Sequence, residues 1–548
     1  MRDTKLPPAS DFAVDTLPFA DSSTFASLEQ YAGQLPMKDD ASMFFWLITN
    51  TTNAYNHDKL LIWLNGGPGC TSLDGVFMEN GPFQFSGANQ LVPRSHSFSE
   101  QFDVLYIDQP FGTGFSSSNS TYYEHTFVSG THTLLEFLER FYTVFPELRK
   151  RQLFLAGESE AGTYIPYLAD AILDMPEPKF DLRGLMIGNG WVDPFPMYMS
   201  YLELLRRRSM LTPNVQSKLE TEMARCAREF NRAPQPVHTS KCEGTASVFL
   251  DDGGPAPGMC YNQYDLRLTD THPSCGMNWP PEVGVFTEYL NRKDVQAAIN
   301  VRKAPSVWTE CNNAVHRMLS HDESPPSVIL LPSILEQVPV LFFVGTEDYL
   351  CNEVGTEWTV GNLTWAGDTG FSSLRKRSVW TINGHQVGVV ESDRGLTYAR
   401  IHNASHMVGV DRPRELLDLF TLFTNASSDN LHFRSSFRSS DITQPVSQSH
   451  VWIGFIILIA LLVIVLAAIV AVVCRARLFA WWVKRRGYGS LGRDDALALY
   501  EGLDDAFVMS EFSFKPIRKS VDHNGLLLDE SMASSPDDDM EIPRPRLE

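Results

Sequence analysis

Short apolar runs that end in glycine-rich turns recur between residues 60 and 344. They are Leu60–Leu64 before Asn-Gly-Gly-Pro-Gly, Val104–Ile107 before Asp-Gln-Pro, Leu153–Ala156 before Gly-Glu-Ser, Leu185–Ile187 before Gly-Asn-Gly, and Val340–Val344 before Gly-Thr-Glu-Asp. Uninterrupted apolar runs of this length are typical of strands that are buried on both faces, as in a parallel sheet flanked by helices. The pattern predicts an α/β fold with a central, mostly parallel sheet.

Longer amphipathic stretches lie between and after these runs. Thr133–Tyr142 and Thr163–Leu173 are expected to be helices that cross over the sheet, and Pro413–Phe423 a helix that closes the domain. From Gly190 to about Pro332 the pattern loosens and four of the cysteines cluster. Residues 191–332 are therefore expected to form a cap inserted into the core.

One segment near the C-terminus is apolar throughout. Residues 451–473 form a run of 23 uncharged residues, and about 20 suffice for a helix to span the hydrocarbon core of a bilayer. Basic residues follow the run, namely Arg475, Arg477, Lys484, Arg485 and Arg486. The positive-inside rule then predicts a single-pass type I membrane protein with a cytosolic tail at residues 474–548. The Ser-rich residues 427–450 are expected to form a stalk.

Two further features favour a lumenal location for the residues before that segment. Sequons for N-glycosylation begin at Asn50, Asn119, Asn362, Asn403 and Asn425, and none lies in the tail. Seven of the eight cysteines precede the apolar segment, and 226/242 and 260/275 are spaced like local disulfide loops. A lumenal domain requires a signal peptide, and the first fifteen residues contain no apolar h-region.

Charge and composition exclude one class of partner. The 548 residues include 66 Asp and Glu against 45 Lys and Arg, a formal net charge of −21, whereas nucleic-acid binding requires concentrated positive charge. The 43% hydrophobic content is ample for a large core. An acidic protein is instead expected to attract cationic substrates.

A nucleophile elbow is expected at Gly157–Gly162. The sequence Gly-Glu-Ser-Glu-Ala-Gly lies between a predicted strand and a predicted helix, where G-x-S-x-G lifts the serine hydroxyl, here that of Ser159, off the sheet. A serine nucleophile needs a histidine base and a carboxylate that orients it, and α/β-hydrolases order them Ser, acid, His. Asp348 and His406 fit this order, so Ser159, Asp348 and His406 form a candidate catalytic triad.

Five sequence motifs occur in order along the chain. They are WLNGGPGC (Trp63–Cys70), ENGPF (Glu79–Phe83), IDQPFGTGFS (Ile107–Ser116), GESEAG (Gly157–Gly162) and HMV (His406–Val408). Together they resemble the serine carboxypeptidases related to carboxypeptidase Y, over about residues 28 to 423. The resemblance implies an α/β-hydrolase fold, with a lumenal catalytic domain at residues 28–426 after an N-terminal segment, 1–27. A lumenal domain, a membrane span and an acidic tail together most resemble the fungal pheromone-processing branch of that family, which resides in the late Golgi.

The resemblance implies roles for the remaining site residues position by position. The backbone N–H groups of Gly67 and Glu160 would form the oxyanion hole. Burial beside Glu79 is expected to raise the pKa of Glu158, which could then donate a proton in a hydrogen bond to the C-terminal carboxylate of the substrate. The residues expected to bind that carboxylate are Trp63, Asn65, Gly66, Glu79 and Glu158.

Three positions depart from the family pattern. Glu160 follows the nucleophile where the family usually has Tyr, Thr346 stands in the acid loop where it has Asp, and Gly409 follows the HMV motif where it has Pro. The Glu160 side chain is expected to face the substrate residue before the scissile bond (P1) and to favour Lys or Arg there. The same carboxylate should oppose the oxyanion, and Gly409 should loosen the loop that carries the base.

The resemblance also implies three disulfide bonds. These are Cys70–Cys311, Cys226–Cys242 and Cys260–Cys275, which leaves Cys351 as a free thiol near the acid. No cysteine cluster has the paired C-x-x-C spacing of a zinc site, and we expect neither a metal nor a cofactor.

These features favour a serine carboxypeptidase that releases C-terminal residues, preferentially Lys and Arg, from peptides and proproteins in the secretory pathway. The expected location is the trans-Golgi network membrane, and tail motifs at Tyr488, Tyr500 and Phe512 resemble aromatic signals for sorting machinery. Two alternatives stay open: a lumenal esterase or acyltransferase with the same triad, and a catalytically impaired membrane glycoprotein that binds peptides. The expected carboxylate-binding residues argue against the first. Fluorophosphonate labelling, which requires an activated serine, would distinguish the second.

Overall fold

The computed structural model describes residues 6–425, except 21–24, 39, 52–57, 88–89, 118–122, 231–236 and 240, together with a short strand at 437–438. These residues all belong to one structural unit, Met1–Ile442. Within them, no helix combines the length and the apolar character needed to cross a bilayer. The predicted membrane span, the cytosolic tail with its motifs, and Asn119 lie outside the described residues, as does nearly all of the predicted stalk.

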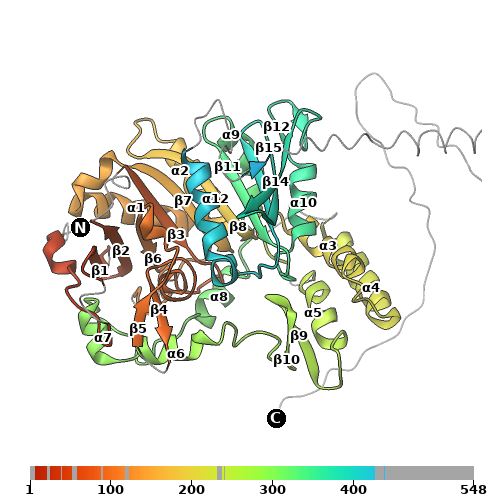
Figure 1. Ribbon diagram of the computed structural model, residues 1–548, viewed down its shortest axis with the longest axis horizontal. Helices are drawn as coiled ribbons and strands as arrows, with labels where there is room; N and C mark the ends of the chain where they lie inside the picture. The colour runs from red at the N-terminus through yellow and green to blue at the C-terminus, as the bar shows by residue number, and fades with distance from the viewer. Residues whose placement is uncertain are drawn as a thin grey trace, which may run out of the picture. The chain divides into compact units, whose positions relative to one another are not determined.

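A sheet of eleven strands runs through the centre of this unit (Figure 1). In spatial order the strands are β1 (Leu28–Pro36), β2 (Ser42–Asn50), β6 (Asp103–Ile107), β3 (Lys59–Leu64), β7 (Gln152–Ser159), β8 (Asp181–Gly190), β11 (Val340–Gly345), β16 (Leu396–Ile401), β15 (His385–Asp393), β14 (Lys376–Ile382) and β17 (Phe437–Arg438). The six strands from β6 to β16 pair in parallel, and the strands on both flanks pair antiparallel. The α/β prediction is confirmed, but the sheet is mixed, so the expectation of a mostly parallel sheet holds only for its centre.

Both faces of the central strands are buried, which explains their uninterrupted apolar sequences. In β3, Leu60 and Ile62 belong to one hydrophobic core with α1 and α2, whereas Leu61 and Trp63 belong to a second core with α12. The helices that follow the strands are α1 (Phe127–Val144), α2 (Ala161–Leu173), α10 (Glu353–Asn362), α11 (Val408–Asp411) and α12 (Pro413–Asn425). The three helices predicted from the sequence correspond to α1, α2 and α12.

A long insertion separates β8 from β11. Its helices and strands are α3 (Pro194–Arg207), α4 (Pro213–Phe230), α5 (Glu243–Asp252), β9 (Met259–Asn262), β10 (Asp265–Thr271), α6 (Glu282–Leu290), α7 (Lys293–Ala298), α8 (Asn313–Leu319) and α9 (Leu331–Leu335). In Figure 1, α3, α4 and α5 lie together at one end of the unit. The helices α6 and α7 lie at the other end, near the hairpin of β4 (Phe83–Ser86) and β5 (Gln90–Pro93). The insertion therefore covers the core in two separate parts.

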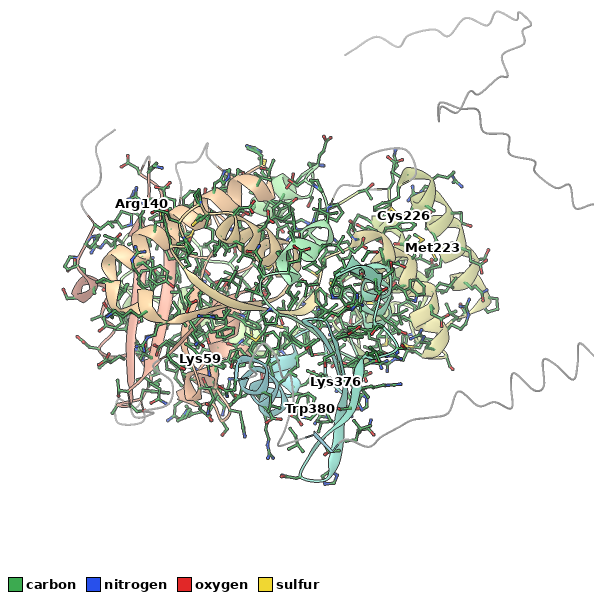
Figure 2. All side chains as sticks on the ribbon, turned by 90° about the horizontal axis from the view of Figure 1, so that it is seen from above. Lys59, Arg140, Met223, Cys226, Lys376 and Trp380 are labelled. Carbon is green, nitrogen blue, oxygen red and sulfur yellow. A yellow bond between two sulfur atoms is a disulfide. The ribbon has the colours of Figure 1, made fainter. Side chains whose placement is uncertain are left out.

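All three disulfide bonds that the resemblance implied are present. They join Cys70 to Cys311, Cys226 to Cys242, and Cys260 to Cys275, and Cys351 is a free, buried thiol. Figure 2 shows Cys226 on α4, at the opposite end of the unit from Arg140 on α1. The bond of Cys70 ties the loop after β3 to the inserted segment before α8.

Candidate active site

Ser159 ends strand β7, and helix α2 begins two residues later. Its φ angle is +61°, in the left-handed region that residues other than glycine rarely adopt. The chain before it is in close contact with β3, because a Cβ at Gly157 would lie 2.1 Å from the carbonyl oxygen of Leu64. The G-x-S-x-G motif therefore forms the sharp turn predicted from the sequence and presents Ser159 at the carboxyl end of the sheet.

Asp348 and His406 lie beyond the carboxyl ends of two strands near β7. Asp348 follows β11 and His406 follows β16, and β7, β8, β11 and β16 are consecutive in the sheet. Nδ1 of His406 lies 2.8 Å from Oδ2 of Asp348, and both side chains are buried. The Ser159 hydroxyl has no hydrogen-bond partner among the described residues. Contacts of this kind often tighten only when substrate binds.

Asn189, which the sequence analysis did not single out, holds the acid in place. Its Nδ2 donates to Oδ2 of Asp348 at 2.7 Å, and its Oδ1 accepts from the N–H of Gly345 at 3.1 Å. Two backbone N–H groups also donate to the Asp348 carboxylate. The carboxylate is thus held in one orientation toward His406, which fixes the tautomer and the ring position of the imidazole. Asn189 lies in the Gly-Asn-Gly sequence that ends β8, so its position at the end of a central strand was the available signal.

Asp348 and two neighbouring side chains are close enough together to ligate a metal ion. Asp348, Cys351 and His406 each place a ligand atom within 4.8 Å of the others. Burial raises the pKa of the Cys351 thiol well above its usual value, and a protonated thiol is a poor metal ligand. The hydrogen bond between Asp348 and His406 accounts for the short spacing, and the arrangement suits proton transfer.

The loop after β3 approaches the elbow from the neighbouring strand. A Cβ at Gly66 would lie 2.5 Å from the amide nitrogen of Glu160 and 2.7 Å from the Cβ of Ser159, so only glycine permits this approach. Among the described residues, neither the N–H of Gly67 nor that of Glu160 donates a hydrogen bond. Two unpaired backbone donors beside Ser159 are the groups that an oxyanion hole requires.

A chain of hydrogen bonds links Trp63, Asn65 and two carboxyl groups beside the elbow. Nε1 of Trp63 donates to Oδ1 of Asn65 at 2.8 Å. Nδ2 of Asn65 donates to Oε1 of Glu79 at 2.8 Å and to Oε1 of Glu158 at 3.1 Å. Glu79 is fully buried and Glu158 is 4% exposed. With Gly66 next in the chain, the five residues expected to bind a carboxylate lie together.

Burial and proximity perturb these two carboxyl groups differently. Burial, and then the charge and hydrogen bond of Glu79, raise the pKa of Glu158 well above its usual value. Burial also raises the pKa of Glu79, but hydrogen bonds with Glu158 and Asn65, and the nearby charges of His406 and Arg94, oppose that rise. The two carboxyl groups therefore favour sharing a proton, and the charge of Glu79 favours its placement on Glu158.

Two of the three family departures differ from what the sequence suggested. The Glu160 side chain is only 4% exposed, and its Oε1 lies 3.3 Å from Nε2 of His238 in the insertion, so the carboxylate contacts a histidine of this chain. Gly409 is packed tightly, because a Cβ there would lie 2.8 Å from the Cβ of Glu79. That contact fixes the loop instead of loosening it. Thr346 donates to Glu347 at 3.1 Å in the acid loop.

Comparison with known proteins agrees with the geometry of the site. A family model described as serine carboxypeptidase matches residues 20–426. The pheromone-processing carboxypeptidase of Pyricularia oryzae is 39% identical over 431 residues, covering 76% of this chain and 68% of that protein. The corresponding protein of Coprinopsis cinerea is 36% identical over 450 residues, covering 78% and 72%.

A solved structure extends the comparison to three dimensions. The crystal structure of a prohormone-processing carboxypeptidase from Saccharomyces cerevisiae matches with a TM-score of 0.69 and 32% identity, over 76% of this chain and 96% of that one. The chain thus belongs to the serine carboxypeptidase family, and it is a serine carboxypeptidase with an α/β fold.

Proposed function

We propose that Ser159 is the nucleophile, His406 the general base and Asp348 the acid that orients it. The Ser159 hydroxyl attacks the carbonyl carbon of the last peptide bond while Nε2 of His406 takes its proton, and the N–H groups of Gly67 and Glu160 stabilise the oxyanion. His406 then gives the proton to the departing amine as the C–N bond breaks. Water, activated by the same imidazole, hydrolyses the acyl-enzyme and restores Ser159. The 2.8 Å contact between His406 and Asp348 supports this assignment.

The observation that carries the proposal is the buried carboxyl pair beside the elbow. A protonated Glu158 donates a hydrogen bond to the C-terminal carboxylate of the substrate, and Trp63, Asn65 and Gly66 surround the same place. A bond in the middle of a peptide presents no carboxylate there. The same pair therefore accounts for the release of single residues from the C-terminus and disfavours an esterase.

A preference for C-terminal Lys and Arg is supported by a second pair of acids, Asp74 and Glu310. Asp74 is buried and lies one residue before the turn that carries Glu79. Burial, and then the charge of Glu310, raise the pKa of Asp74 well above its usual value, and burial raises the pKa of Glu310. No N–H or hydroxyl group of the described residues reaches Oδ1 of Asp74. Two acids that share one proton keep a negative charge, which the cationic side chain of the last substrate residue (P1′) would neutralise.

We place the enzyme in the secretory pathway as a single-pass type I protein of the trans-Golgi network membrane, acting on peptides and proproteins. The uncharged run 451–473 with its basic flank supports the anchor. Three disulfide bonds support an oxidising compartment. The sequon asparagines within the described residues are exposed or half-exposed, as glycosylation requires, and they are Asn50, Asn362, Asn403 and Asn425. The cytosolic tail would bind sorting machinery.

Digestion of a peptide that ends in Lys-Arg, followed by mass spectrometry, tests the proposed activity. We expect single residues to be lost in order from the C-terminus, slow reaction with the same peptide carrying a C-terminal amide, and no reaction with Ser159→Ala. Internal fragments, or equal rates for the free and amidated peptides, would contradict it. For the anchor, the full chain should stay in the membrane pellet after alkaline extraction and shift in mobility on deglycosylation, whereas a chain that ends at residue 450 should be released.

A further inference from the structure

The carboxylate that follows the nucleophile is paired with a histidine from the insertion. Glu160 belongs to the turn between β7 and α2, and its side chain is 4% exposed. His238 lies between α4 and α5, and its Nε2 is 3.3 Å from Oε1 of Glu160. Among the described residues neither of these two buried atoms makes a hydrogen bond. Each is therefore the polar partner available to the other.

The position of His238 is fixed from two sides. Its ring stacks on Trp191, with an interplanar angle of 12° and centroids 5.9 Å apart. The neighbouring residue, Val237, accepts a hydrogen bond from Nε1 of Trp191 at 3.0 Å and donates one to the carbonyl oxygen of Ser324 at 3.0 Å. The imidazole thus lies on the Trp191 ring with Nε2 3.3 Å from Oε1 of Glu160.

The charges around the ring favour the protonated form. Burial lowers the pKa of His238, but the charge and hydrogen bond of Glu160, with the charges of Glu243 and Asp322, outweigh that effect and raise the pKa above its usual value. His316 on α8 lies near the His238 imidazole. Burial, and then the charge of His238, lower the pKa of His316, so His316 is neutral when His238 is charged. His238 is thus placed to form an ion pair with Glu160, whose Oε1 lies 3.3 Å from its Nε2.

Three further titratable side chains near the pair are uncharged at neutral pH. They are Tyr164, Tyr198 and Cys351. Burial is the main cause that raises the pKa of each of these side chains well above its usual value, and the charge of Glu160 adds to the rise.

A charged Glu160 without a partner would oppose catalysis. Covalent geometry keeps a glutamate carboxylate within about 5 Å of its own amide nitrogen. That N–H is one of the two proposed donors to the oxyanion, so the carboxylate would repel the negative charge that the donor has to stabilise. A cation in contact with the carboxylate removes most of this repulsion.

We propose that His238 is a positioning residue that, as an imidazolium, neutralises Glu160 and holds its carboxylate toward the insertion, so that the oxyanion can form against the Glu160 N–H. His238 touches neither the substrate nor Ser159 in this role, and no bond to it forms or breaks. The inference rests on the proposed roles of Ser159 and of the Glu160 N–H. It accounts for how this chain tolerates an acid where related enzymes usually have tyrosine.

A double-mutant comparison tests the proposal. His238→Gln should lower kcat about 10- to 100-fold at pH 6 with little change in KM, because the unpaired carboxylate now opposes the oxyanion. Adding Glu160→Gln should restore kcat to the level of Glu160→Gln alone, because the opposing charge is gone. The matched control is His272→Gln, which breaks an exposed pair with Asp251 in the same insertion and should leave kcat unchanged. An unchanged kcat in His238→Gln, or a double variant that keeps the full loss, would overturn the proposal.

The pH profile gives a second, independent measurement. The kcat of the wild-type enzyme should be highest below the pKa of His238 and fall as pH rises through it, whereas Glu160→Gln should lose that fall and exceed the wild-type kcat at pH 8. If His238→Gln does not fold, this profile decides, and an unchanged alkaline fall in Glu160→Gln sinks the idea. Fluorophosphonate labelling of Ser159→Ala tests the nucleophile separately, so failure of the proposed triad and failure of the His238 role give different results.

Discussion

The carboxyl groups of Glu79 and Glu158 share one donor, the side-chain amide nitrogen of Asn65, which lies 2.8 Å from the first and 3.1 Å from the second. Both hydrogens of that nitrogen are thereby engaged, and Oδ1 of Asn65 accepts from Trp63 and Gly75. Asn65 cannot turn without breaking four contacts. The network therefore fixes both carboxyl groups next to Ser159.

The pH dependence of KM should depend on the C-terminus of the substrate. Because a buried Glu158 with a raised pKa must hold its proton to bind a carboxylate, KM for free-acid peptides should rise as pH increases from about 5 to 8. Glu158→Gln keeps a donor that does not titrate and should flatten this profile. Amidated or esterified substrates serve as the control, and an equally steep profile for them would refute proton donation by Glu158.

The triad predicts large and similar losses in two variants. Ser159→Ala and His406→Ala should each lower kcat by about 10⁴-fold or more, because the two residues act as one unit. Asn189→Leu should cause a smaller loss, since it removes one of the donors that orient Asp348. Steady-state kinetics with active-site labelling measures all three. A Ser159→Ala variant that keeps most of its activity would show that another nucleophile is used.

The sequence predicts those parts of the fold in which local pattern and burial agree. Strands β3, β7 and β11 each contain an uninterrupted apolar run because both faces of the sheet are covered there, so they are evident from the sequence pattern alone. The antiparallel flank is different: β15 begins with two exposed residues and then alternates between half-buried and buried positions, and Trp380 is the one buried residue of β14. Figure 2 places Trp380 and Lys376 of β14 away from the centre of the unit. Such strands carry too weak a hydrophobic signal to separate them from loops.

In the candidate site, too, some residues follow from a local sequence pattern and others do not. Ser159 lies in a motif whose turn geometry is local, and Asp348 and His406 follow from chain order after strands. Asn189 contacts an acid 159 residues further along the chain, and His238 meets Glu160 from an inserted segment, so neither contact leaves a pattern in the nearby sequence. Contacts that depend on how an insertion folds back over the core require the three-dimensional structure.

The acids Asp74 and Glu310 should set the preference for a basic C-terminal residue. Asp74→Asn and Glu310→Gln should each reduce the kcat/KM advantage of Lys or Arg over Leu by roughly 10- to 100-fold, the worth of about 1.5–3 kcal/mol for a hydrogen bond to a charged group. Peptides that differ only in the last residue measure this ratio. Glu288→Gln on the exposed surface of α6 is the control. If the ratio is unchanged in both variants, the basic preference has another origin.

Asp193, just before α3, should make the folded protein less stable as pH rises. Burial raises the pKa of Asp193 to about 6, above the value near 3.8 of a free aspartate, so the folded state binds a proton more tightly than the unfolded state. The stabilisation from this proton is complete below about pH 4 and is lost as pH rises through 6.

Replacing Asp193 with Asn removes the ionisation and keeps a residue favoured at a helix N-terminus. Asp193→Asn should therefore raise the free energy of unfolding by about 1–3 kcal/mol at pH 8, where the buried carboxylate is charged, and change it little at pH 4. Denaturant unfolding at both pH values measures the difference. The control is Asp368→Asn, at an exposed position on the hairpin of β12 (Thr364–Trp365) and β13 (Asp368–Thr369). A stability gain that is the same at pH 4 and pH 8 would mean that the effect comes from packing or helix capping, because only the ionised carboxylate carries the burial penalty.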